Sequence, residues 1–202
     1  MIDPKQVEKI VSYLKAGGVI ALPTETIYGL CCDPRNEEAV ERLFQIKQRD
    51  PSKAVLCVTG RREHINKIAE IPSSFEPIAR AFWPGPLTVI FPLKTSANLS
   101  PLTLHEGTIA LRLSPDPLIQ EITQLLESPI VATSANISGQ PFLQNADDVK
   151  RVFGDQLNLI IETDHPLLQT PSTLISYTKN GTVSLVREGA IPWTDIQTVL
   201  ET

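Results

Sequence analysis

The chain contains 202 residues, of which 18 are Lys or Arg and 23 are Asp or Glu, so its formal net charge is −5. Hydrophobic residues make up 42% and charged residues 20%, a composition that excludes a disordered or fibrous protein. The acidic balance argues against a protein that holds nucleic acid by bulk positive charge, but not against a local basic pocket. A chain of this length can bury a sizeable core without disulfides, and we expect one domain over residues 1–202.

The sequence shows no recognisable targeting or membrane segment. Apolar runs such as residues 19–22 and 87–91 have the length of strands and are too short to span a membrane. The first residues lack the basic and apolar regions of a signal peptide. The three cysteines, of which Cys31 and Cys32 are adjacent, form neither a disulfide framework nor a metal motif. We therefore expect a cytoplasmic protein with no membrane contact.

The start of the chain predicts two helices around a buried strand. Asp3 can cap a helix that has a proline in its first turn and that ends at Gly17-Gly18. Residues 19–22 follow as a short apolar strand. Asn36 can then cap a second helix, which runs toward Lys47.

Further helices and strands alternate along the rest of the chain. The apolar spacing predicts helices over residues 62–69, 75–82, 117–126 and 146–152. It predicts strands over residues 54–58, 87–93, 108–113, 130–132, 159–161, 173–177 and 183–186, the last of which close the chain. Asn180-Gly181 is typical of a hairpin turn. This order favours an α+β (α/β-type) fold with a twisted mixed β-sheet flanked by helices.

Most familiar catalytic motifs are missing. The sequence contains no Walker-type phosphate loop, no Gly-x-Gly-x-x-Gly, no His-Glu-x-x-His and no Gly-x-Ser-x-Gly. Its three histidines, His64, His105 and His165, stand far apart among polar neighbours, which is more typical of surface residues than of a catalytic triad.

Two polar segments are candidates for a site. Pro23-Thr-Glu-Thr-Ile-Tyr-Gly29 directly follows a predicted strand, where open sheets bind ligands, although its Thr and Glu side chains could equally satisfy a turn. Lys47-Gln-Arg-Asp-Pro-Ser-Lys53 carries three cations at a helix end. These cations could clamp a triphosphate or could compensate the helix dipole on a solvated face.

Two more segments and two arginines stand out. Thr133-Ser-Ala-Asn-Ile-Ser-Gly139 offers small polar groups to a phosphate or base, but it also fits a capped helix start or an Asx-turn. Phe82-Trp-Pro-Gly-Pro-Leu-Thr88 is interpreted as a structural aromatic turn. Arg112 and Arg187 lie in or at the end of apolar strands, where a cation requires a carboxylate, a phosphate or solvent.

Together these segments resemble the YrdC family of threonylcarbamoyl-AMP synthases, in its single-domain bacterial branch. The resemblance is carried by five stretches that span nearly the whole chain: residues 23–30, 47–49, 83–88, 134–139, and 172–173 with 187–189. It implies that L-threonine, bicarbonate and ATP, with magnesium, yield threonylcarbamoyl-AMP and pyrophosphate. A separate transferase complex then uses the product to modify the adenosine next to the anticodon of certain tRNAs.

The resemblance also implies site residues. The family pattern places L-threonine against Thr26, Arg112 and Ser172, with Tyr28 shaping the pocket. It places ATP against Lys47, Arg49, Lys53, Thr108, Ser134, Asn136 and Arg187. It assigns no general acid or base. No paired carboxylates mark a metal site, although Glu106 or Asp116 could contribute, and magnesium held by the ATP phosphates is the simpler expectation.

Departures from the family pattern and two alternatives stay open. The family often has Lys-x-Arg-Pro and then Pro-Leu, where this chain has Asp50-Pro51 and Ala54-Val55. Some relatives carry a His near Val58 and a Ser near Phe142 as ligand contacts, and this chain has neither. The chain could be a paralogue that acts on another carbamoyl-type substrate. It could also be a non-catalytic RNA-binding module, which the net charge disfavours, so direct contact with tRNA is expected to be weak.

Overall fold

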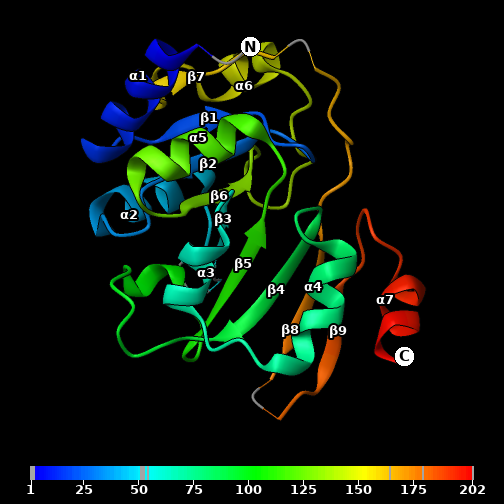
Figure 1. Cartoon of the computed structure of the whole chain (residues 1–202). Coiled ribbons are helices and arrows are strands. Elements are labelled where there is room, and N and C mark those ends of the chain that lie inside the picture. Colours follow the sequence, from blue (N-terminus) through cyan, green and yellow to red (C-terminus); the bar gives the residue numbers. More distant parts are fainter. Residues whose placement is uncertain (1–2, 51–52, 54, 164, 179, 202) are drawn as a thin grey trace.

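A nine-stranded mixed sheet runs through the computed structural model (Figure 1), which describes residues 3–50, 53, 55–163, 165–178 and 180–201. The spatial order of its strands is β7-β1-β2-β6-β3-β5-β4-β8-β9. Their bounds are β1 Ile20–Leu22, β2 Gly29–Cys32, β3 Leu56–Thr59, β4 Leu87–Pro92, β5 Thr108–Leu113, β6 Ile130–Ser134, β7 Leu159–Ile160, β8 Thr173–Tyr177 and β9 Val183–Arg187. The pairs β1/β7, β3/β5 and β4/β8 are parallel and the others are antiparallel, which confirms the predicted mixed sheet.

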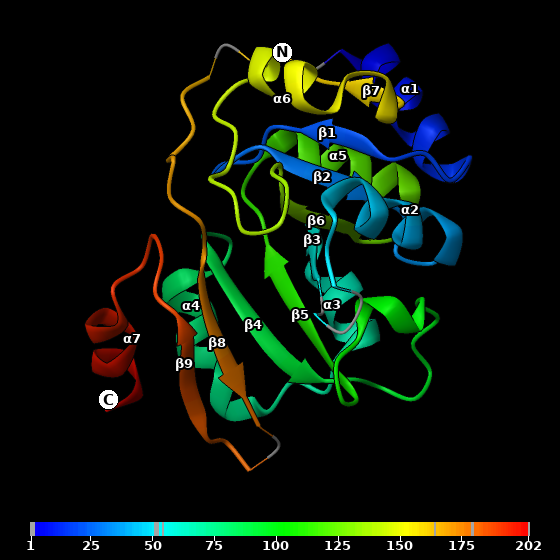
Figure 2. The same ribbon diagram turned by 180° about the vertical axis from the view of Figure 1, so that it is seen from behind.

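Helices cover both faces of this twisted sheet. They are α1 Pro4–Lys15, α2 Glu37–Lys47, α3 Arg62–Ile68, α4 Glu76–Phe82, α5 Pro117–Leu126, α6 Ala146–Phe153 and α7 Trp193–Leu200. Helices α1 and α5 pack side by side on one face, and α2 lies on the other (Figures 1 and 2). The strands near β1 cross the view while those near β4 run steeply, so the two ends of the sheet are strongly rotated relative to each other (Figure 1).

The sheet separates two hydrophobic cores. The smaller one joins Ile10 and Leu14 of α1 to Ile119 and Ile122 of α5. The larger one fills the opposite side and includes Phe75, which meets the rings of Trp83, Phe91 and Tyr177 edge-on at centroid distances of 5.0, 5.0 and 5.4 Å. The aromatic turn at Trp83 is therefore structural, as the sequence indicates.

The capping residues act as the sequence predicts. Asp3 accepts a hydrogen bond from the backbone N–H of Lys5 at the start of α1, and Asn36 accepts one from Ala39 at the start of α2. Helix α2 ends at Gln48, whose positive φ of 50° reverses the chain. This reversal leaves Lys47 inside the protein while the chain continues toward Arg49.

Two elements differ from the sequence prediction. Strands do not close the chain, because α7 follows β9 and buries Ile196 against the larger core. Strand β2 was also missed, since its residues Gly29–Cys32 directly follow the polar segment that obscured their apolar pattern. The predicted strand over residues 54–58 corresponds to β3, which spans Leu56–Thr59. Ala54, the first residue of the prediction, lies outside the described residues.

None of the helices in the described part of the chain combines the length and the apolar character that a membrane span requires.

The aromatic cluster makes Phe75 a test of the larger core. Because Phe75 is fully buried between three rings, Phe75→Ala is expected to lower the free energy of unfolding by about 3–5 kcal/mol. Urea denaturation measures this loss, and Phe82→Ala is the control because Phe82 is only partly buried. A loss at Phe75 no larger than at Phe82 would contradict this account of the core.

Candidate functional site

A pocket of about 400 Å³ opens over the central strands of the sheet. Its walls come from segments far apart in the sequence: the β1–β2 loop, the chain just after α2, strands β3, β4, β5 and β6 with the loop after β6, the chain before and within β8, and the end of β9. Seven of the eleven residues proposed from the sequence line it: Thr26, Arg49, Arg112, Ser134, Asn136, Ser172 and Arg187.

Arg112 forms the floor of this pocket. It lies on β5, where it is paired with Val58 of β3 on one side and with Thr88 of β4 on the other. Only 3% of its surface is exposed, and its Nε lies 3.4 Å from Oε1 of Glu25 without a hydrogen bond between them. Burial lowers the pKa of Arg112, and Glu25 opposes this change. The pocket therefore holds a buried cation that is only partly neutralised.

Hydroxyl groups of the β1–β2 loop connect Arg112 to the backbone. Nη1 of Arg112 donates to Oγ1 of Thr26 at 3.0 Å, and the hydroxyls of Thr26 and Thr24 are 2.9 Å apart. Thr24 donates its single hydroxyl proton to the carbonyl of Ile27, so Thr26 must donate to Thr24. Both hydroxyl protons consequently point away from the guanidinium, which fixes the loop against it.

A second hydroxyl pair lines the pocket on the β4 side of Arg112. The side chains of Thr88 on β4 and Ser172, just before β8, are 2.7 Å apart and both are buried. Nη2 of Arg187 on β9 donates to the carbonyl oxygen of Ser172 at 3.0 Å. Burial lowers the pKa of Arg187, and the charge of Arg112 adds to this effect. Both arginines therefore line the pocket close enough for their charges to interact.

Ser134, the last residue of β6, and Asn136, in the loop that follows, form another end of the pocket. The Ser134 hydroxyl donates to Oδ1 of Asn136 at 2.6 Å, and Nδ2 of Asn136 donates to the carbonyl of Gln140. The backbone N–H between them, of Ala135, donates to the carbonyl oxygen of Tyr28. The segment is therefore a loop fixed by its own polar groups, and the capped helix start considered from the sequence is wrong, since α6 begins at Ala146.

Lys47 supports this loop from behind. Only 1% of its surface is exposed, and its Nζ donates to the carbonyl oxygens of Ser134 and Asn136 and to Oδ1 of Asn136. Its own carbonyl accepts the N–H of Ser138 at 2.8 Å. The alternative in which Lys47 compensates a helix dipole on a solvated face is therefore wrong.

The charge of Lys47 meets neutral oxygens rather than a carboxylate. Among the described residues no Asp or Glu forms an ion pair with it. Burial lowers the pKa of Lys47 to about 7, and the nearby charge of Arg49 acts in the same direction. An anion bound in the pocket would stabilise the charged form of Lys47 and so be attracted to this end.

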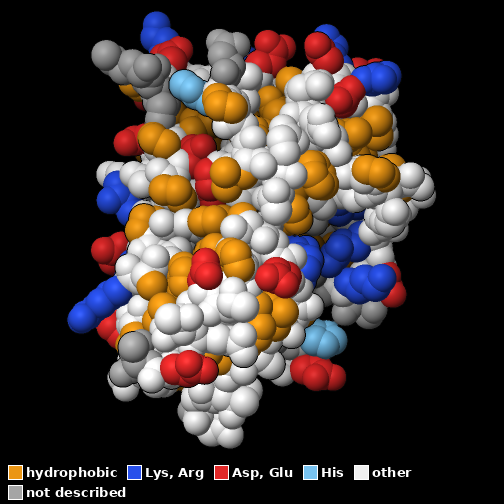
Figure 3. Space-filling view, turned by 90° about the vertical axis from the view of Figure 1, so that its right-hand side faces the viewer, with side chains coloured by type: hydrophobic (Ala, Val, Ile, Leu, Met, Phe, Trp, Pro, Cys, Tyr) orange, Lys and Arg blue, Asp and Glu red, His pale blue; other side chains and the backbone are white. Residues whose placement is uncertain are grey.

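Arg49 completes the cationic wall. It lines the pocket, its Nε donates to the carbonyl of Lys53 at 3.1 Å, and its guanidinium lies 6.0 Å from the ring of Phe44. Lysine and arginine side chains gather around a recess on one face of the molecule (Figure 3). The overall negative charge of the chain is therefore unevenly distributed.

The remaining proposed residues lie outside the described pocket wall. Tyr28 is buried in the larger core, and its hydroxyl donates to the carbonyl of Ile161 at 3.1 Å. Thr108 begins β5, on the same side of the strand as Arg112, but its hydroxyl donates to the carbonyl of His105. Lys53 is exposed and contributes its backbone carbonyl to Arg49.

Sequence reasoning missed Glu25, Thr88 and Ser114. Ser114 donates to Oε2 of Glu25 at 2.8 Å, which holds the carboxylate beside Arg112. Glu25 and Thr88 lie within segments that the sequence singles out, but only the pairing of β4 with β5 shows that Thr88 lies beside Arg112. Phe142 also lines the pocket.

The pocket suits anions better than a protein-bound metal ion. No group of three or more His, Cys, Asp or Glu side chains that could hold a metal occurs in the part of the chain that the structure describes. Asp116 instead caps α5 by accepting the N–H groups of Leu118 and Ile119, and Glu106 is exposed. Cations and hydroxyl donors around one cavity fit a ligand that carries carboxylate and phosphate groups.

Comparison of the sequence with known proteins matches it to one family. A family model for Sua5, YciO and YrdC, described as "Telomere recombination", matches residues 12–189. A protein from Vibrio vulnificus named threonylcarbamoyl-AMP synthase is 36% identical over 157 residues, which are 76% of this chain and 84% of that protein. One of the same name from Pyrococcus abyssi is 32% identical over 202 residues, which are 98% of this chain and 58% of the relative.

Solved structures show the same similarity. The crystal structure of Pyrococcus abyssi Sua5 complexed with L-threonine superposes with a TM-score of 0.89 at 31% identity, over 98% of this chain and 58% of that one. Escherichia coli YciO superposes with a TM-score of 0.84 at 25% identity, over 95% and 93% of the two chains.

Lys47 generates a pH-dependent prediction. Because its pKa is about 7 in the folded chain and 10.5 for an unperturbed lysine, the unfolded chain binds more protons between these pH values. The free energy of unfolding should therefore rise with pH above 7, by up to about 1.4 kcal/mol per pH unit from this group. In Lys47→Met this contribution is absent.

Urea denaturation at several pH values above neutrality measures the difference between the two chains. Lys150→Met, at an exposed position of α6, is the control and should follow the unsubstituted chain. Parallel pH curves for the unsubstituted chain and Lys47→Met would contradict the depressed pKa.

Proposed function

Because the chain belongs to the Sua5/YciO/YrdC family, we propose that its pocket makes threonylcarbamoyl-AMP and pyrophosphate from L-threonine, bicarbonate and ATP. The observation that carries this proposal is the buried guanidinium of Arg112 on the floor of a pocket whose opposite end is also cationic. A substrate with a carboxylate at one end and phosphates at the other is complementary to this distribution of charge.

Arg112 is the residue that we assign to the carboxylate of threonine. Its two-pronged guanidinium can donate to both carboxylate oxygens, and the nearby hydroxyls of Thr26 and Ser172 provide further polar contacts. The carboxylate of Glu25, whose Oε1 lies 3.4 Å from Nε of Arg112, holds the guanidinium in place. The amino acid would therefore enter a polar recess that is already ordered.

The ATP phosphates are assigned to the other cations and to the loop after β6. Arg49 and Arg187 line the pocket with Ser134 and Asn136, whose small side chains allow close approach of a phosphate. Lys47 adds positive charge behind this loop. Fixed donors of this kind stabilise charge that develops on a transferring phosphorus without reorganisation during the reaction.

The reaction then needs little covalent chemistry from the protein. The amine of threonine attacks the carbon of bicarbonate, and water leaves to give a carbamate. A carbamate oxygen attacks the α-phosphorus of ATP, and the bond from that phosphorus to the bridging oxygen breaks to release pyrophosphate. The pocket contributes position and charge stabilisation, so the absence of a nucleophile motif agrees with this chemistry.

Magnesium belongs to this proposal as part of the MgATP substrate. The described pocket wall offers guanidinium, hydroxyl and amide groups and no cluster of carboxylates, so its residues do not form a magnesium site of their own.

The fate of the product is also part of the proposal. Threonylcarbamoyl-AMP is a mixed anhydride that must reach a separate transferase complex, which modifies tRNA. Because the chain is acidic, we expect its own contact with tRNA to be weak. The cysteines Cys31, Cys32 and Cys57 are free and buried, which is consistent with the reducing cytoplasm where tRNA is modified.

A three-substrate assay tests the proposed activity. Purified protein should release pyrophosphate from MgATP only when L-threonine and bicarbonate are both present, because the carbamate is the nucleophile. Mass spectrometry of the product should show the threonylcarbamoyl adenylate. Release that does not depend on threonine, or that proceeds equally with other amino acids or carbamoyl phosphate, would contradict it.

Two substitutions test the assignment of the pocket ends. Arg112→Lys keeps a charge for Glu25 but loses the forked donors, so KM for L-threonine should rise by about tenfold or more while KM for ATP changes little. Arg49→Ala should instead raise KM for ATP and change KM for L-threonine little. Steady-state kinetics with each substrate varied separately measures both, and equal changes in the two KM values would contradict the division.

A further inference from the structure

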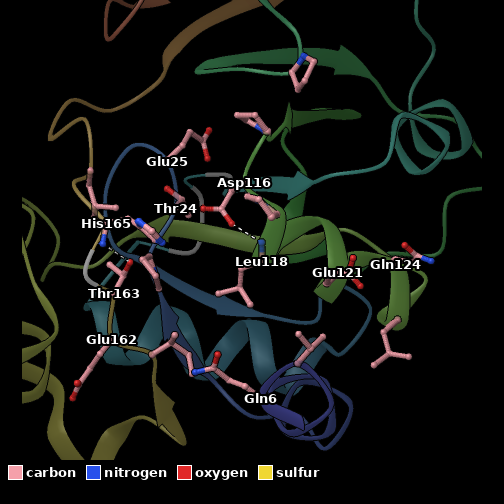
Figure 4. Close-up of a pocket in the computed structure, with 18 of the residues that line it drawn as sticks. Gln6, Thr24, Glu25, Asp116, Leu118, Glu121, Gln124, Glu162, Thr163 and His165 are labelled. Atoms are coloured by element: carbon pink, nitrogen blue, oxygen red, sulfur yellow. Dashed lines mark hydrogen bonds between the residues drawn. The ribbon is translucent and has the colours of Figure 1, made fainter. Parts of the chain in front are cut away.

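A second and larger groove, of about 1590 Å³, lies beside the substrate pocket. Its walls are the start of α1, the β1–β2 loop, the turn before β4, helix α5 and the segment that follows β7. Figure 4 shows Glu162 and His165 on one side of this groove and Glu121 and Gln124 on the other. The two cavities meet at Thr24, which lines both.

The groove carries the opposite charge to the substrate pocket. Six carboxylates line it: Glu8, Glu25, Asp116, Glu121, Glu127 and Glu162. No Lys or Arg occurs among its lining residues in the described part of the chain, which leaves the imidazole of His165 as the one basic side chain there. A cationic occupant is therefore favoured and a phosphate backbone is repelled.

Rigid and exposed apolar groups lie between these carboxylates. Seven of the chain's 17 prolines line the groove, and each fixes the backbone φ of its own position. Leu125 and Leu168, which are 45% and 55% exposed, are two of the five large hydrophobic side chains that the described structure leaves exposed. Preformed walls with unburied leucines are typical of a surface that a partner covers.

The size and chemistry of the groove identify the kind of occupant. Its volume exceeds the range of about 300–1,000 Å³ that is usual for small-molecule pockets. The carboxylates disfavour RNA, while the leucines and prolines offer apolar contacts to a polypeptide. We infer that this groove docks an extended segment of a partner protein that carries Lys or Arg next to apolar residues.

The position of the groove gives such a partner access to the reaction. Glu25 lines the groove and also contacts Arg112 of the substrate pocket, so a docked segment lies next to the place where the product forms. This docking does not depend on the proposed chemistry, because the groove is defined by residues outside the assigned substrate contacts.

Binding of a short synthetic peptide tests the inference. The probe is a fluorescent peptide that repeats Lys-Pro-Leu, and its counterpart has Glu in place of each Lys. Fluorescence anisotropy should show binding of the Lys peptide that weakens with salt, and no binding of the Glu peptide. Glu121→Lys and Leu125→Ser, both on α5, should each weaken binding by about tenfold.

Matched substitutions elsewhere provide the controls. Glu41→Lys on α2 repeats the charge reversal at an exposed helical position, and Leu200→Ser on α7 removes a leucine that is 41% exposed. Both should leave peptide binding unchanged, and all four variants should keep full pyrophosphate release. Retention of activity separates a failure of the docking inference from a failure of the proposed function.

Four results would overturn the inference: no binding of the Lys peptide, equal weakening by Glu121→Lys and Glu41→Lys, displacement of the peptide by an RNA oligonucleotide, or sedimentation as a dimer that Leu125→Ser dissociates. The third result would assign the groove to nucleic acid, and the fourth would assign it to a second copy of this chain.

Discussion

The buried guanidinium of Arg112 is the constraint around which the rest of the pocket is arranged. A cation in the middle of a sheet loses its hydration, and this loss is tolerated only when partners surround it. Glu25 lies against one edge of the guanidinium, Thr26 accepts from another, and Ser114 holds the carboxylate in place. The β1–β2 loop is therefore ordered by contacts to a strand more than eighty residues later, and the same contacts leave Arg112 available to a substrate carboxylate.

The second buried cation, Lys47, is stabilised in a different way. Its ammonium is surrounded by carbonyl and amide oxygens of the loop after β6, whereas Arg112 has a carboxylate neighbour. Neutral acceptors satisfy its N–H groups without cancelling its charge. The positive potential consequently persists at the end of the pocket assigned to the phosphates, at the cost of a pKa lowered to about 7.

The net charge of −5 is unevenly distributed over the molecule. Arginines line the substrate pocket, whereas carboxylates line the adjoining groove, and the Glu25–Arg112 contact lies at the boundary between them. Opposite charges at this distance stabilise each other across the boundary. The arrangement allows one small protein to attract an anionic nucleotide on one side while its other side favours a basic polypeptide.

The sequence by itself determined the local features: the caps Asp3 and Asn36, most helices and strands, and the polar segments that hold Thr26, Lys47, Arg49, Arg112, Ser134 and Asn136. These depend on spacing and on neighbouring residues, which a sequence displays directly. Only the tertiary structure decided that Lys47 is buried behind a loop, that Tyr28 points into the core, and that Glu25 and Thr88 belong with Arg112. Strand order and register bring these groups together, and both arise from packing between distant segments, which no local pattern encodes.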